Sequence, residues 1–65
     1  MIIEINTAIA GCSLQTDHPA IAQAFISLIT KAISPEAWLA IVWQIYPDNV
    51  ETAKAIMINC LSVGA

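Results

Sequence analysis

Residues 34–46, SPEAWLAIVWQIY, predict a helix that is apolar on almost every side. Ser34 can cap the first backbone N–H groups, Pro35 suits the first helical position, and Glu36 complements the positive end of the helix dipole. Beyond this first turn, Gln44 is the only polar side chain before the closing tyrosine, apart from two indole N–H groups. A helix that is hydrophobic all round has to be buried all round, so we expect it to lie at the centre of the protein.

The two tryptophans of this helix point in different directions. Trp38 and Trp43 are five residues apart, which separates them by about 140° around the helix axis. They cannot both face one small core, so we expect one of them to contact a partner, where tryptophan is a frequent binding hot spot. The alternative is that the N-terminal segment buries both. The predicted partner interface comprises Trp38, Leu39, Ile41, Val42, Trp43, Ile45, Ile26 and Ile33.

Proline-containing breaks predict three helices, over residues 18–33, 35–46 and 48–62. Asp48 is followed three residues later by Glu51, which resembles a capping box at the start of the third helix. In the first helix the polar residues form one narrow stripe, so its apolar arc is wider than that of an ordinary surface helix. Two flanking helices cannot enclose the central one completely, and a second copy or a different protein is expected to finish its burial.

The N-terminal segment fits two structures. Alternation of apolar and polar residues up to about Ile9 predicts a β-strand, which the isoleucines favour. However, Ile2, Ile5, Ile9 and Cys12 also fit one face of a helix. A lone strand needs a hydrogen-bonding partner, and since no second strand is visible in the sequence, that partner would be another chain. The predicted fold is therefore mainly α: a small three- or four-helix domain, with any N-terminal strand paired between chains.

The composition indicates association with another protein. The 65 residues form one domain, 1–65, and a chain of this size buries only about 60% of the surface that its unfolded form exposes. Hydrophobic residues make up 58% of the chain and charged residues 11%, where about 25% charged is usual. Twelve residues are isoleucine, more than a small interior can enclose. We therefore predict a non-enzymatic assembly module, either a homo-oligomer or a subunit that docks on a larger protein.

The charge argues against nucleic-acid binding. The formal net charge is −3, and the chain has Lys31 and Lys54 but no arginine, whereas nucleic acids are bound by Lys and Arg side chains that neutralise phosphates. A short strand followed by helices resembles the ribbon-helix-helix repressors, which dimerise through N-terminal strands, over the first half of the chain. That resemblance implies a small DNA-binding dimer as a further alternative. Glu4, Asn6 and Ala8 would stand where those repressors carry polar and basic side chains, and this chain has a third helix.

Cys12, His18 and Cys60 are the soft metal-ligand candidates of the chain. Structural zinc sites usually take four ligands in paired short spacings, and no such pair is present. Catalysis by a cysteine and a histidine also needs an orienting group and a concave pocket. We therefore predict no metal, no cofactor and no enzymatic activity. The two cysteines are expected to be reduced, buried thiols, with a disulfide joining the chain ends as the alternative.

The apolar run between residues 20 and 46 raises the question of a membrane. Lys31 and residues 34–36 interrupt it, which leaves two pieces too short to span a bilayer. No positively charged segment precedes an apolar stretch at the start, so a signal peptide is not expected. These features predict a cytoplasmic protein, and membrane association is kept as the alternative to the assembly module.

Overall fold

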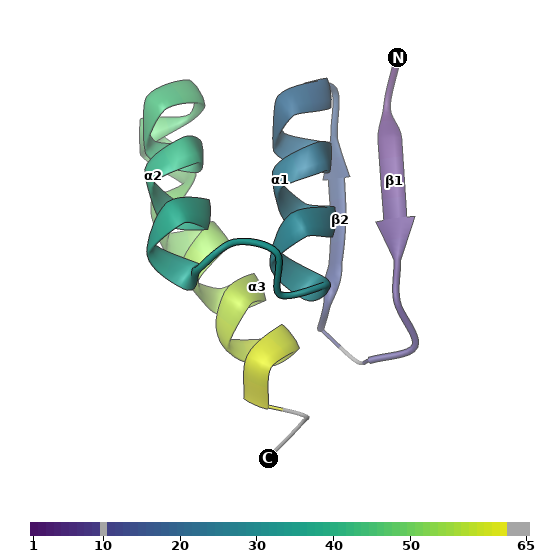
Figure 1. Ribbon diagram of the computed structural model, residues 1–65. Coiled ribbons are helices and arrows are strands. Elements are labelled where there is room, and N and C mark those ends of the chain that lie inside the picture. The colour runs from purple at the N-terminus through teal and green to yellow at the C-terminus, as the bar shows by residue number, and fades with distance from the viewer. Residues whose placement is uncertain (10, 63–65) are drawn as a thin grey trace.

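The computed structural model describes residues 1–9 and 11–62 and has three helices beside a β-hairpin (Figure 1). In chain order the elements are β1 (Ile3–Asn6), β2 (Ser13–Thr16), α1 (Pro19–Ile29), α2 (Pro35–Ile45), a 3₁₀ turn (Pro47–Asn49) and α3 (Val50–Ser62). Helix α1 packs between the hairpin and α2, and α3 crosses behind α2 in this view. The prediction of a small, mainly helical domain is confirmed, and the alternative of a fourth, N-terminal helix is wrong.

The N-terminal strand pairs with a second strand of the same chain. Strands β1 and β2 are antiparallel, with Ile3 opposite Thr16 and Ile5 opposite Leu14 on the inner face of the hairpin. The expectation that the chain holds no second strand is therefore wrong. Residues 13–16, SLQT, are too short and too polar to stand out as a strand, and they become one because β1 lies alongside. Pairing of β1 with another chain stays a prediction.

The loop between the two strands is anchored to α3. Gly11 has φ +79°, a conformation that favours glycine, and a Cβ at this position would lie 2.6 Å from Asn59 Nδ2, so a larger residue would also displace the Asn59 side chain. Asn59 Nδ2 donates a hydrogen bond to the Gly11 carbonyl oxygen at 3.4 Å. Within the loop, the Thr7 hydroxyl accepts a hydrogen bond from the Ile9 N–H at 3.2 Å and donates one to the Cys12 carbonyl.

The proline-containing breaks start the first two helices as predicted. His18 Nδ1 accepts a hydrogen bond from the Ala20 N–H at 3.3 Å, and Ser34 Oγ accepts one from the Ala37 N–H at 3.2 Å. The third start differs from its prediction. Because Pro47–Asn49 form a 3₁₀ turn in which no side chain caps the backbone, the α-helix begins at Val50 and not at residue 48.

Helix α1 ends four residues before its predicted end. Lys31 has φ +63°, the left-handed conformation that commonly terminates a helix. The following N–H, that of Ala32, then bonds back to the Ser27 carbonyl at 2.8 Å. The helical spacing of apolar residues continues through Ile33, and the chain has no glycine at this helix end, where glycine is usual. For these reasons the sequence pattern predicted a longer helix.

Replacing Lys31 by glycine should stabilise the protein. A side chain in the left-handed region destabilises the folded protein by about 1–2 kcal/mol. Glycine removes this cost, but its greater conformational freedom in the unfolded chain offsets part of the gain. We expect Lys31→Gly to raise the free energy of unfolding by about 0.5–1 kcal/mol in urea titrations. The matched control is Lys54→Gly, because this lysine lies inside α3, where glycine should cost about 1 kcal/mol. A Lys31→Gly protein less stable than the parent would contradict the prediction.

The core lies where the three helices and the inner face of the hairpin meet. Its largest fully buried side chains are Trp38, Phe25, Leu28 and Cys12. The ring centroids of Phe25 and Trp38 are 5.9 Å apart, a favourable distance for an aromatic pair. The buried indole N–H of Trp38 donates a hydrogen bond to the Ala53 carbonyl at 3.2 Å. This bond satisfies the one polar group of the indole and links α2 to α3.

Cys12 and Cys60 form a disulfide, with their Cα atoms 4.9 Å apart. The expectation of two reduced thiols is therefore wrong. The bond links the residue just before β2 to the last part of α3, which descends toward the hairpin loop in Figure 1. The two cysteines are 48 residues apart, and only the course of the whole chain brings them together.

Candidate functional site

The predicted interface residues of α2 divide between the core and the surface. Trp38 and Val42 are buried inside the chain, at 1% and 3% exposure. Trp43 is 65% exposed. The remaining predicted residues of α2, namely Leu39, Ile41 and Ile45, are half-buried against the core. What α2 offers to another molecule is therefore centred on Trp43.

Trp43 belongs to an outward stripe of α2. Glu36, Ala40, Trp43 and Gln44 are all exposed, and their spacing of four, three and one residues places them on one side of the helix. The helix is thus open along one face of the single chain, as expected for a helix that its two neighbours cannot enclose, and its burial by a partner stays a prediction. The alternative that both tryptophans are buried within the chain is wrong.

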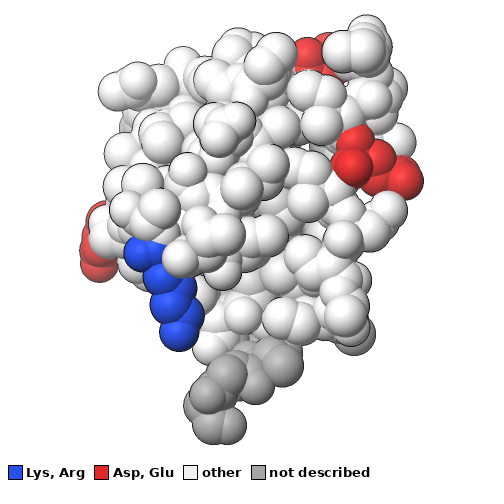
Figure 2. Space-filling view, turned by 45° about the vertical axis from the view of Figure 1, so that its right-hand side comes forward, with Lys and Arg blue, Asp and Glu red and all other residues white. Residues whose placement is uncertain are grey.

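The two predicted interface residues of α1 differ in their exposure. Ile26 is 41% exposed, whereas Ile33, in the loop after α1, is half-buried. Other large apolar side chains reach the surface at Met1, Ile2, Ile58 and Leu61. Figure 2 shows that charged side chains form only small, separate groups on the face it presents, with wide uncharged areas between them. The described surface therefore offers much apolar area and little charge to oppose close contact.

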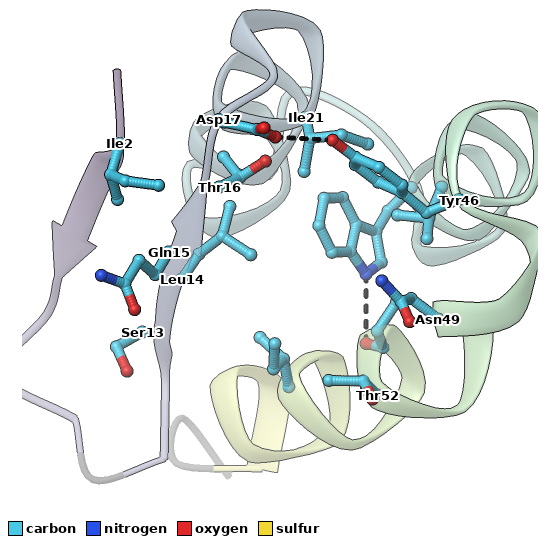
Figure 3. Close-up of a pocket in the computed structure, with 14 residues that line it drawn as sticks. Ile2, Ser13, Leu14, Gln15, Thr16, Asp17, Ile21, Tyr46, Asn49 and Thr52 are labelled. Carbon is cyan, nitrogen blue, oxygen red and sulfur yellow. Dashed lines mark hydrogen bonds between the residues drawn. The ribbon is translucent and has the colours of Figure 1, made fainter.

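A groove of about 660 Å³ lies between β2 and α3 (Figure 3). Its strand side is formed by residues 13–17 together with Ile2, which precedes β1, and its helix side by the 3₁₀ turn and α3. Ile21, Trp38 and Val42 line its inner part. This groove could not be predicted from the sequence, because its two sides come from segments that are far apart in the chain and meet only in the folded structure.

One end of the groove is closed by a hydrogen bond between Tyr46 and Asp17. The Tyr46 hydroxyl donates to Asp17 Oδ1 at 2.7 Å (Figure 3). This bond stabilises the carboxylate, so it lowers the pKa of Asp17 below its usual 3.8, and it raises the pKa of Tyr46 above 10.0. The ring of His18 contacts the Tyr46 ring edge-on, with centroids 6.1 Å apart. Nothing in the sequence links Asp17 to a tyrosine 29 residues away, so this contact could not be predicted.

Removing the tyrosine hydroxyl should raise the pKa of Asp17. In Tyr46→Phe the carboxylate loses the donor that contributes most to its lowered pKa, so NMR titration of the Asp17 carboxyl carbon should give a pKa closer to 3.8. The lowered pKa of Asp17 also makes the stability of the protein depend on pH. A depressed folded pKa stabilises the protein above the unfolded value, and this contribution is lost as the pH falls through the folded pKa. Acid unfolding should therefore be less steep in Tyr46→Phe, and an unchanged Asp17 pKa would contradict the assignment.

The outer face of the hairpin gives no basic surface. It presents Glu4, Asn6, Ser13 and Gln15, all exposed, and Asn6 Nδ2 donates a hydrogen bond to Glu4 Oε1 at 3.1 Å. The face that would read DNA in the ribbon-helix-helix comparison is thus neutral or acidic in the described part of the chain.

The three soft metal-ligand candidates have structural roles. Cys12 and Cys60 are bonded to each other, and His18 uses Nδ1 to cap α1. Over residues 1–9 and 11–62 there is no group of three or more His, Cys, Asp or Glu side chains placed to hold a metal ion. In the same residues, no helix combines the length and the apolar character needed to cross a bilayer.

Comparisons with protein-family models, with curated proteins and with solved structures give no match to this chain. Two features of the described residues are candidates for binding another molecule: the exposed face of α2 around Trp43, and the groove between β2 and α3.

Proposed function

We propose that this protein is a non-enzymatic association module, anchored by Trp43, that forms a homo-oligomer. The supporting observation is a tryptophan 65% exposed on a regular helix in a chain with 11% charged residues. A tryptophan buries about 150–250 Å² when fully enclosed. Covering the exposed part of Trp43 would therefore remove about 130 Å² from water, worth about 3 kcal/mol.

A second copy of the chain is the partner that this surface fits best. In a two-fold contact the same patch supplies both sides, so each copy contributes an exposed indole to the other. Ala40 lies one turn before Trp43 on the same stripe and leaves room for a neighbouring side chain. Charge does not select a partner here, because the only charged residue on that stripe is Glu36 at the far end of α2.

The free edge of β1 offers a second contact between copies. The hairpin has two strands only, and no backbone hydrogen bond from another described segment reaches Ile3–Asn6 on the outer side. An exposed edge of this kind can pair with another strand. Pairing of β1 with β1 of a second copy would give a continuous four-stranded sheet and would satisfy the predicted pairing between chains.

Light scattering coupled to size-exclusion chromatography tests the proposal. The parent protein should run as a dimer or a larger discrete species, and Trp43→Glu should be a folded monomer. The matched control is Gln44→Glu, which adds the same charge at the neighbouring exposed position of α2 and should keep the oligomer. A parent that stays monomeric at every concentration, or a Gln44→Glu protein that dissociates as fully as Trp43→Glu, would contradict a Trp43 interface.

Membrane association is the alternative that the same tryptophan raises, because tryptophan is enriched at membrane interfaces. Anionic lipid surfaces attract basic segments, and the chain has two lysines only. Sedimentation with phosphatidylcholine vesicles separates the two proposals. Binding to vesicles that Trp43→Glu abolishes, with no oligomer in solution, would support the membrane over the second copy.

A further inference from the structure

We propose that the groove between β2 and α3 binds an extended peptide segment of a partner protein as an added strand, with a basic group of the peptide beside Asp17. This site is separate from the Trp43 surface, since Trp43 does not line the groove. The inference goes beyond self-association and would hold even if the protein is a monomer.

The strand side of the groove is the open edge of β2. Five consecutive residues, Ser13 to Asp17, line the groove. Successive side chains of a strand point to opposite faces, so what all five share is the backbone edge that faces away from β1. Strand β2 pairs with β1 alone, and no backbone hydrogen bond from another described segment reaches Ser13–Thr16. The N–H and C=O groups of β2 that point away from β1, which belong to alternate residues, are therefore free for a ligand backbone.

The helix side runs alongside this edge. Asn49, Thr52, Ala53 and Ile56 line the groove, and their spacing places the last three on one face of α3. Figure 3 shows β2 and α3 on two sides of the opening. An open strand edge beside a helix face is the arrangement in which some peptide-recognition domains take up a ligand by strand addition.

Two links fix the groove at its ends. The disulfide from Cys12, just before β2, to Cys60 of α3 lies at one end, and the Tyr46–Asp17 hydrogen bond lies at the other. An extended chain rises about 3.4 Å per residue, so the five-residue edge accommodates a peptide of about four or five residues. The links also fix the position of the hairpin relative to α2 and α3, which reduces the ordering cost of binding.

The interior of the groove specifies apolar side chains at alternate positions. Leu14 and Ile21 point into it from the strand and α1 (Figure 3), and the buried Trp38 also lines it. A peptide in strand conformation turns every second side chain toward this interior.

Charge gives the peptide a preferred end. Among the described residues that line the groove, Asp17 is the only one with a charged side chain. Its carboxylate faces solvent at the closed end, where it accepts hydrogen bonds from the Tyr46 hydroxyl and from its own backbone N–H. A lysine, an arginine or a free amino group at the end of the peptide complements it.

A phage-displayed library of linear heptapeptides, selected on the purified parent protein, tests the proposal. The selected sequences should have large apolar residues at alternate positions and a basic residue near one end. Synthetic versions N-methylated at single backbone positions should lose affinity at every second residue, because alternate N–H groups face β2. A selected family with helical spacing, an N-methyl scan without alternation, or no enrichment would each overturn the proposal.

Matched variants locate the binding. Thr52→Trp fills the groove from its helix wall and should weaken peptide binding roughly tenfold or more. Ala55→Trp makes a similar change at an exposed position of α3 outside the groove and should leave the affinity unchanged. Asp17→Asn should remove the preference for a basic residue. Trp43→Glu should retain full peptide affinity, so failure of self-association and failure of this site are distinguishable. Equal binding by the two tryptophan variants would overturn the location.

Discussion

Replacing both cysteines by serine, Cys12→Ser with Cys60→Ser, should lower the free energy of unfolding by about 4 kcal/mol. The estimate follows from the loop of 48 residues that the disulfide closes, because the bond removes conformational freedom from the unfolded chain. A domain of this size has only about 3–10 kcal/mol of stability in total. Loss of the disulfide should therefore lower the melting temperature by roughly 15–30 °C, or leave the chain partly unfolded at room temperature.

Thermal unfolding followed by circular dichroism, with and without a reductant, measures this effect. The parent should lose stability on reduction, whereas the double serine variant should not respond to the reductant. The single variants are less informative, since each leaves an unpaired thiol that can link two copies. Equal melting temperatures for the oxidised and reduced parent would show that the bond contributes little to the fold.

The disulfide also bears on where the protein works. Disulfides persist in oxidising compartments and are rare in the cytosol, so the bond does not favour the predicted cytoplasmic location, which stays a prediction. Alkylation of free thiols at the moment of cell lysis, followed by intact mass measurement, gives the redox state in the cell. An alkylated pair would place the protein in a reducing compartment, with the disulfide formed only after extraction.

The helices could be predicted from the sequence because their signals are local. Pro19 and Pro35 mark the first turns of α1 and α2, and His18 and Ser34 supply the caps within two or three residues of the groups they bond. Spacing also predicted that Trp38 and Trp43 would not both face one small core. What spacing could not decide was which tryptophan lies inside, since that depends on how α1 and α3 pack against α2.

The hairpin, the disulfide and the groove depend on contacts between distant segments. The residues of β2 have little strand preference of their own, and they are extended because β1 pairs with them. Cys12 meets Cys60 only after α3 has returned to the hairpin loop. The free edge of β2 beside α3 results from both, because α1 follows the hairpin directly and occupies the inner face of the sheet. The candidate peptide site is thus a consequence of the topology.

Replacing Trp38 by alanine should lower the free energy of unfolding by about 3–5 kcal/mol. Trp38 is 1% exposed, lies in a tilted pair with Phe25 and donates its indole N–H to the Ala53 carbonyl. Its loss leaves a large cavity where α1, α2 and α3 meet, and it removes the hydrogen bond that links α2 to α3 through Ala53. Urea titration of the parent and the variant measures the difference.

Trp43→Ala is the matched control, because it makes the same substitution five residues later on the same helix. At a dilution where light scattering finds the protein monomeric, it should change the free energy of unfolding by less than about 0.5–1 kcal/mol. At higher concentration its cost should grow, since an oligomer stabilised through Trp43 gains stability with protein concentration. A concentration-dependent difference at Trp43, beside a constant large loss at Trp38, would show that the helix uses one tryptophan for folding and the other for association. If both variants lose the same amount at every concentration, Trp43 is a core residue and the interface lies elsewhere.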